Sequence, residues 1–136
     1  MKALGGAVRA REHAERERAA KEQERARLAE EAEALRSAEG SRLERGELHA
    51  ADLQRQGAWE VRTQWDDEER ARGVATAREG EGRAKDGEGK ARGAVASAEA
   101  EAKVVDKHRD EWVAEGERAA EAVAEEGARE AWRPRR

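Results

Sequence analysis

The feature that most constrains the fold is a stripe of small and apolar residues in the last third of the sequence. Its members recur at alternating steps of four and three residues. This spacing averages close to 3.5 and keeps one helix face in line, as in the seam of a coiled coil. Because few of these side chains are large, we expect the helix to need a partner for stability. The stripe comprises Ala91, Val95, Ala98, Ala102, Val105, Arg109, Trp112, Gly116, Ala119 and Val123.

The composition argues against a compact core and in favour of helices. Of the 136 residues, 37% are hydrophobic and only 3% aromatic, so large side chains are too few to fill a globular centre. Charged residues make up 44%, but 28 basic and 32 acidic residues nearly cancel, and their signs alternate at helical spacing rather than forming the one-sign runs of disordered tails. We therefore predict an all-α protein: a long two-helix antiparallel coiled-coil hairpin with no compact globular core.

A second apolar stripe begins at Leu28 and continues to Trp65 at three- and four-residue steps. All six leucines lie between Leu4 and Leu53, so we expect the first helix to supply large side chains and the second to supply small ones. The segment from Arg9 to Leu28 is almost wholly Arg, Glu and Ala and is expected to be a solvated arm. The predicted helix–helix seam consists of Leu28, Leu35, Leu43, Leu53, Val61, Trp65, Val95, Val105 and Val123.

The predicted turn lies where glycine is most frequent. Six glycines fall between Gly73 and Gly93, and each costs about 1 kcal/mol in a helix relative to alanine. We expect one domain, residues 1–136. Its first helix spans residues 7–72 and is followed by a glycine-rich turn at residues 73–90. The second helix spans residues 91–131, and a basic tail follows at residues 132–136. A break at Gly40-Ser41 is the open alternative, because Ser41 and Glu44 have the spacing of a capping box.

No residue pattern points to catalysis or to a cofactor. Cysteine is absent and the three histidines, His13, His49 and His108, lie far apart, so we expect no metal site and no thiol chemistry. Acidic pairs such as Asp66-Asp67 lack the enclosing pocket that a general acid needs. The near-balanced charge argues against a nucleic-acid ligand, and no apolar run is long enough to cross a bilayer. We therefore expect a soluble intracellular protein that is not an enzyme.

The four tryptophans are the only aromatic residues and are candidates for partner contact, because tryptophan is enriched at binding hot spots. Trp65 and Trp112 fall on the two stripes and are expected to pack within the hairpin. Trp59 and Trp132 lie off the stripes and are the better candidates for contact with a partner.

Residues 103–112 (KVVDKHRDEW), followed by a Glu/Ala-rich stretch at 114–130, resemble the C-terminal part of the FliJ/YscO family of type III export systems. The N-terminal residues 9–12 (RARE) and the Glu/Arg/Ala-rich segment that follows them resemble sequences of the same family in composition. The partner-binding candidates are accordingly Trp59, Arg109, Trp112 and Trp132.

The resemblance implies a non-enzymatic stalk protein that inserts a helical hairpin into a hexameric export ATPase and contacts the export gate and secretion chaperones. Such a protein is cytoplasmic and peripheral to a membrane-embedded secretion apparatus, and a flagellar and a virulence-type system stay equally open. The alternative is a generic coiled-coil adaptor or a homo-oligomer without an ATPase partner. Stoichiometry separates them, because a stalk binds once per ring whereas a generic coiled coil self-associates.

Overall fold

The computed structural model describes residues 2–133. It consists of two α-helices, α1 (Lys2–Glu44) and α2 (Ala50–Ala131), and the described residues contain no strand. The predicted all-α class is therefore confirmed. The chain divides into two units, which we describe separately: the two-helix unit, up to Ala91, and the C-terminal unit, from Arg92 onward.

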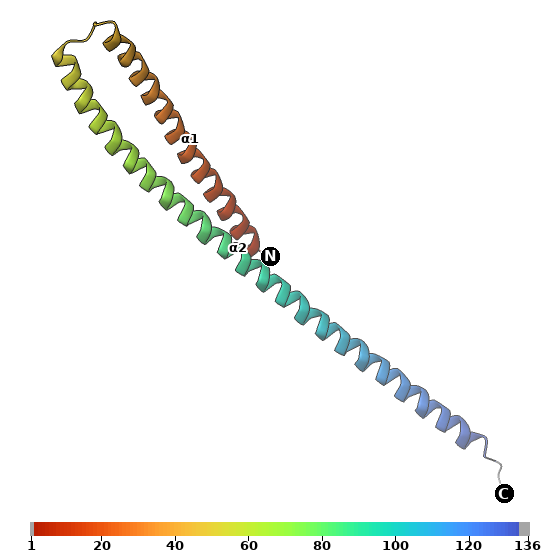
Figure 1. Ribbon diagram of the computed structural model, residues 1–136. Helices are drawn as coiled ribbons and strands as arrows, with labels where there is room; N and C mark the ends of the chain where they lie inside the picture. The colour runs from red at the N-terminus through yellow and green to blue at the C-terminus, as the bar shows by residue number, and fades with distance from the viewer. Residues whose placement is uncertain (1, 134–136) are drawn as a thin grey trace. The chain divides into compact units, whose positions relative to one another are not determined.

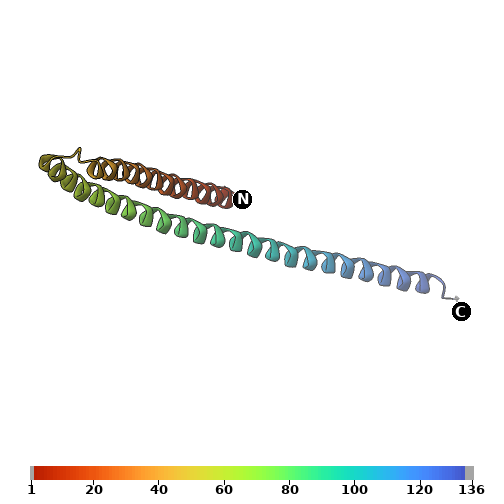
Figure 2. The same cartoon turned by 45° about the horizontal axis from the view of Figure 1, so that its top comes forward.

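In the two-helix unit, α1 lies beside the first part of α2 in both views (Figures 1 and 2). Ion pairs between the helices follow a regular order. Arg11, early in α1, pairs with Glu88 of α2, whereas Arg36, late in α1, pairs with Glu60. The two helices thus pack against each other along most of α1.

Helix α1 ends at a glycine in the left-handed conformation. Gly46 has a φ of 70°. This backbone conformation has little steric cost for glycine, because glycine has no Cβ. Its N–H donates to the Leu43 carbonyl at 3.0 Å, and the N–H of Glu47 donates to the Arg42 carbonyl at 2.9 Å. These two bonds form a Schellman motif, which satisfies carbonyl groups at the helix end and turns the chain away from the helix axis.

At the start of helix α2, the Asp52 side chain accepts a hydrogen bond from the backbone. The N–H of His49 donates to the Asp52 carboxylate at 3.0 Å, and the N–H of Asp52 donates to the His49 carbonyl at 3.0 Å. Asp52 also places a negative charge in the first turn, where it interacts favourably with the helix dipole. The five residues 45–49 are therefore sufficient to connect the helices.

The predicted boundaries at residues 7–72 and 73–90 are wrong, because residues 73–90 are helical and the connection lies at residues 45–49. Gly40 and Ser41 are also helical, and the Ser41 hydroxyl donates to the Ser37 carbonyl at 3.1 Å instead of capping a new helix. Isolated glycines weaken a helix but do not end it unless the chain adopts the left-handed conformation, as it does at Gly46. The end of α2 at Ala131 agrees with the prediction. Of the predicted basic tail, residues 134–136 lie outside the described residues.

Very little apolar surface is buried. Among the described residues, the only buried apolar side chains are those of Ala32 and Val74. Most of the predicted seam is therefore exposed rather than buried between the helices. Leu28 and Val95 are only half-buried, and the other predicted seam residues are exposed: Leu35, Leu43, Leu53, Val61, Trp65, Val105 and Val123.

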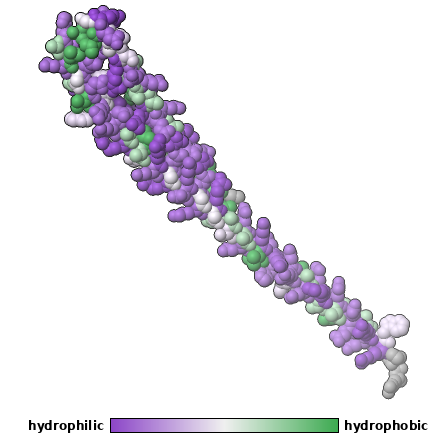
Figure 3. All heavy atoms as spheres, viewed as in Figure 1, coloured by the Kyte–Doolittle hydropathy of each residue, from purple (hydrophilic) through white to green (hydrophobic). Residues whose placement is uncertain are grey.

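The C-terminal unit contains the helical residues 92–131 of α2. Every described residue of this unit is exposed except Val95, which is half-buried. Figure 3 shows its apolar side chains as separate green groups among hydrophilic ones. Within the described part of the chain, neither helix has a stretch long and apolar enough to cross a membrane.

Candidate functional site

The two helices of the two-helix unit meet through a row of arginine–carboxylate pairs. Arg11, Arg18 and Arg25 recur every seven residues and therefore lie on one face of α1. Three carboxylates of α2 accept from their guanidinium groups. The pairs are Arg11 with Glu88, Arg18 with Glu81 and Arg25 with Asp67.

Further charges extend this row into a network. Arg18 also contacts Glu22 of α1 at 2.9 Å, and Glu22 in turn contacts Arg78 of α2 at 2.8 Å. Glu81 accepts from Lys85 at 3.0 Å in addition to its bond with Arg18. Nearer the connection, Arg36 contacts Glu60 at 2.7 Å. We call these cross-helix pairs and their shared neighbours the charged interface.

Two carboxylates of the charged interface are removed from water. Glu81 and Glu88 each keep only 7% of their surface exposed. Burying a carboxylate is costly unless a cation and hydrogen bonds compensate for the lost hydration. Arg11 of α1 compensates Glu88, and Arg18 of α1 together with Lys85 of α2 compensates Glu81. Removing Arg18 therefore leaves Glu81 without its partner across the interface.

The same contacts lower the pKa values of the carboxyl groups. Lys85 and Arg18 hold the pKa of Glu81 below its usual value, against the opposing effect of burial. Hydrogen bonds from Arg25 lower the pKa of Asp67, and those from Arg78 and Arg18 lower the pKa of Glu22. All three groups are therefore ionised at neutral pH.

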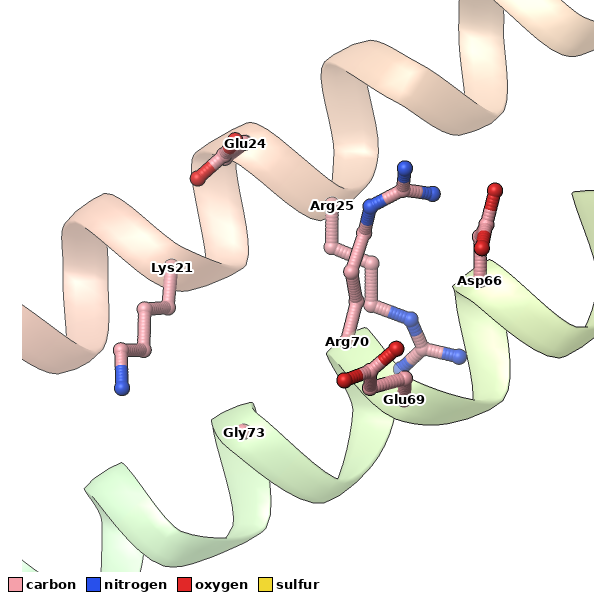
Figure 4. Close-up of a pocket in the computed structure, with 7 residues that line it drawn as sticks. All are labelled: Lys21, Glu24, Arg25, Asp66, Glu69, Arg70 and Gly73. Atoms are coloured by element: carbon pink, nitrogen blue, oxygen red, sulfur yellow. The ribbon is translucent and has the colours of Figure 1, made fainter.

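An open groove of about 440 Å³ lies between the helices beside the charged interface (Figure 4). In the figure Arg25 reaches from α1 toward α2, and Arg70 reaches from α2 toward α1. No cluster of three or more His, Cys, Asp or Glu residues suited to a metal ion occurs among residues 2–133. Basic and acidic groups are equally represented in the lining, so the groove offers no site selective for one charge. The lining residues are Lys21, Glu24, Arg25, Asp66, Glu69, Arg70 and Gly73.

Trp59 lies within the two-helix unit. It is half-buried, and the guanidinium carbon of Arg36 lies 5.8 Å from its ring centroid, a cation–π arrangement. It lines a narrow groove together with Leu28 and Leu35. Trp59 therefore packs between α1 and α2, whereas we expected it to face a partner.

The other three tryptophans are exposed. Trp65, in the two-helix unit, is 68% exposed, and Trp112 is 75% exposed, although we expected both to pack within the hairpin. Trp132 is also exposed, as is Arg109, which lies one helical turn before Trp112. The candidates Arg109, Trp112 and Trp132 thus share the C-terminal unit, and Trp59 does not.

Sequence reasoning missed the charged interface because the search for a seam considered apolar residues only. The signal was nevertheless present, since Arg11, Arg18 and Arg25 keep the seven-residue spacing of a seam, as do Glu81 and Glu88. Basic residues spaced by seven on one segment and acidic residues spaced by seven on another can predict that the two helices pack together, as apolar residues at this spacing do.

Comparison with known proteins provides no relative from which a role could be transferred. The chain matches no family model, and neither a curated protein nor a solved structure matches it. The features that bear on its function are therefore the charged interface between α1 and α2 and the exposed stripe of the C-terminal unit.

Proposed function

We propose that the protein is a non-enzymatic stalk component of a type III secretion export apparatus and that its C-terminal unit binds the partner. The observation that supports this proposal best is that every residue of the helical segment 92–131 except Val95 is exposed. Helices gain most of their stability from packing of an apolar face. An apolar stripe that is exposed in the free protein is therefore a binding surface for another helix or a groove.

The two-helix unit is proposed to act as an antiparallel coiled-coil hairpin that stiffens the stalk. The reversed order of the ion pairs, from Arg11–Glu88 to Arg36–Glu60, supports this arrangement. The helices are unequal, with 43 residues in α1 and 82 in α2, as in the stalk proteins that the sequence resembles. A charged exterior suits a stalk that must lie inside a ring without adhering tightly to it.

Arg109, Trp112 and Trp132 are the proposed contact residues. Exposed tryptophan and arginine side chains are the types most enriched at binding hot spots. By resemblance, the partners are the hexameric export ATPase, the export gate and secretion chaperones, and the place of action is the cytoplasmic side of the secretion apparatus.

The test is sedimentation of the full chain with the export ATPase encoded in the same genome. The proposal expects one copy of the chain per six ATPase subunits. Trp112→Ala should weaken binding, whereas Trp65→Ala, which alters a comparably exposed tryptophan of the two-helix unit, should not. Absence of a complex at any ratio, or equal loss with both variants, would contradict the proposal.

A second candidate function is a self-associating coiled-coil adaptor without an ATPase partner. It is favoured by the spacing of the exposed stripe, because steps averaging close to 3.5 residues match a second helix supercoiled along the first. A chain that self-associates and ignores the ATPase would support this candidate over the stalk.

A further inference from the structure

The exposed stripe of the C-terminal unit carries large and small side chains in an order that restricts which helix can lie against it. Val105, Trp112 and Val123 project from it with more than half of their surface exposed. Small residues lie on the same face on both sides of Val105, Arg109 and Trp112: Ala98 and Ala102 precede them, and Gly116 and Ala119 follow them. A partner helix therefore fits this stripe where it presents small residues opposite Val105 and Val123.

We propose that the stripe pairs with the same stripe of a second copy of this chain, in antiparallel orientation and in one defined register. When the helix is laid against a reversed copy, the stripe residues Val105 and Val123 each meet a small residue. Arg109 meets Trp112 of the second copy, where its guanidinium stacks on the indole ring as a cation–π pair. This stacking accounts for the single charged residue in the stripe. The facing pairs are Val105 with Gly116, Val123 with Ala98, Ala102 with Ala119, and Arg109 with Trp112.

The charges that flank the stripe fit the same register. In an antiparallel coiled coil the positions beside the seam meet their equivalents on the other helix. His108 then faces Glu115 of the second copy, which is a favourable pair. Asp106 faces Val113, and Glu99 faces Ala120, so neither carboxylate meets another one. No pair of like charges flanks the stripe in this register.

Other arrangements of the two copies bring like charges together. A parallel pair places Arg109 against Arg109 and Glu101 near Asp106 of the second copy. An antiparallel pair shifted by one heptad places Asp106 against Asp106 and Glu101 against Glu115. Because like charges across an interface disfavour association, charge complementarity selects the register with Arg109 on Trp112.

This inference requires only a second copy of the chain and does not depend on an export ATPase. Because the pairing and the stalk proposal both use Arg109 and Trp112, a paired stripe is not free to bind the ATPase. A dimer that binds no ATPase supports the pairing, whereas a monomer that joins the ring at one copy per six subunits supports the stalk. These outcomes distinguish the two ideas.

The first experiment is sedimentation equilibrium of the full chain over a range of concentrations. We expect a monomer–dimer equilibrium. Val105→Asp places a charge in the seam of both copies and should weaken the dimer roughly tenfold or more. The matched control, Ala114→Asp, adds the same charge on the outer face and should leave the dissociation constant within about twofold. A monomer at every concentration, or an equal loss in both variants, would overturn the proposal.

The second experiment determines orientation and register by disulfide formation, which the absence of cysteine from the natural sequence makes simple. Val105→Cys and Gly116→Cys are prepared separately and mixed under mild oxidation. The proposed register brings these two positions together, so the mixed disulfide should form faster than either homodisulfide. Faster homodisulfide formation by Val105→Cys alone would indicate a parallel pair and would refute the antiparallel register.

Discussion

Arg25 of α1 and Asp67 of α2 form a two-point contact across the helix pair. The Nε and Nη2 atoms of Arg25 donate to the two carboxylate oxygens of Asp67 at 3.0 and 3.1 Å. Such bidentate contacts fix orientation as well as distance. The pairing of α1 with α2 thus depends on charged groups in defined positions, with only Ala32 and Val74 as buried apolar residues in the described chain.

The pairing of α1 with α2 should weaken in acid. Arg25 lowers the pKa of Asp67 in the folded state, so this group contributes stability above its unfolded pKa and loses it as the pH falls through the lower folded value. Glu22 and Glu81 behave in the same way. We expect the stability to be constant at neutral pH and to fall below about pH 4. Thermal melts followed by circular dichroism would measure it, and a melting temperature unchanged down to pH 2 would contradict the charged interface.

Arg18→Gln should destabilise the two-helix unit more than substitution of an exposed arginine does, because it leaves the buried Glu81 without its partner on α1. Arg27→Gln is the control, since Arg27 forms an exposed pair within α1, with Glu31. The double variant Arg18→Leu, Glu81→Leu should recover stability, because an apolar pair avoids the cost of burying charge. Urea unfolding would rank the variants, and equal losses for the two single variants would exclude a special role for Arg18.

Alanine should stabilise the glycine-rich part of α2. Gly82 and Gly87 are helical, and a Cβ added to either would meet no atom within 4 Å. Gly82→Ala and Gly87→Ala should each stabilise the helix by about 1 kcal/mol. Gly46→Ala should have the opposite effect, because its φ of 70° strains any residue with a Cβ. Melting temperatures that fall in the first two variants would favour a turn near residues 73–90 after all.

Two valines of α2 provide a matched test of where α1 packs. Val74 is 4% exposed and Val61 is 50% exposed. Val74→Ala should cost about 1.5 kcal/mol from the lost burial of apolar groups. Val61→Ala should cost much less, since its side chain already contacts water. Chemical denaturation measures both, and a larger loss at Val61 would mean that α1 packs along a different face of α2.

The sequence determined the helical class and the end of α2 at Ala131. A high content of good helix formers with interleaved charges leaves few alternatives to long helices. The sequence also predicts that Val105, Trp112 and Val123 lie on one face of a helix, because helical periodicity is a local property.

Only the tertiary structure decided where the chain turns and which segments pair. Gly46 ends α1 because a local Schellman motif forms there, whereas the more numerous glycines at 73–90 remain helical. The pairing itself depends on Arg18 meeting Glu81 and on Arg25 meeting Asp67, contacts between residues far apart in the sequence. Helix periodicity defines the faces of each segment, but many pairs of charged faces are compatible with it. Which faces pair depends on the summed stability of the contacts between the two segments. That sum cannot be read from the sequence of either segment alone.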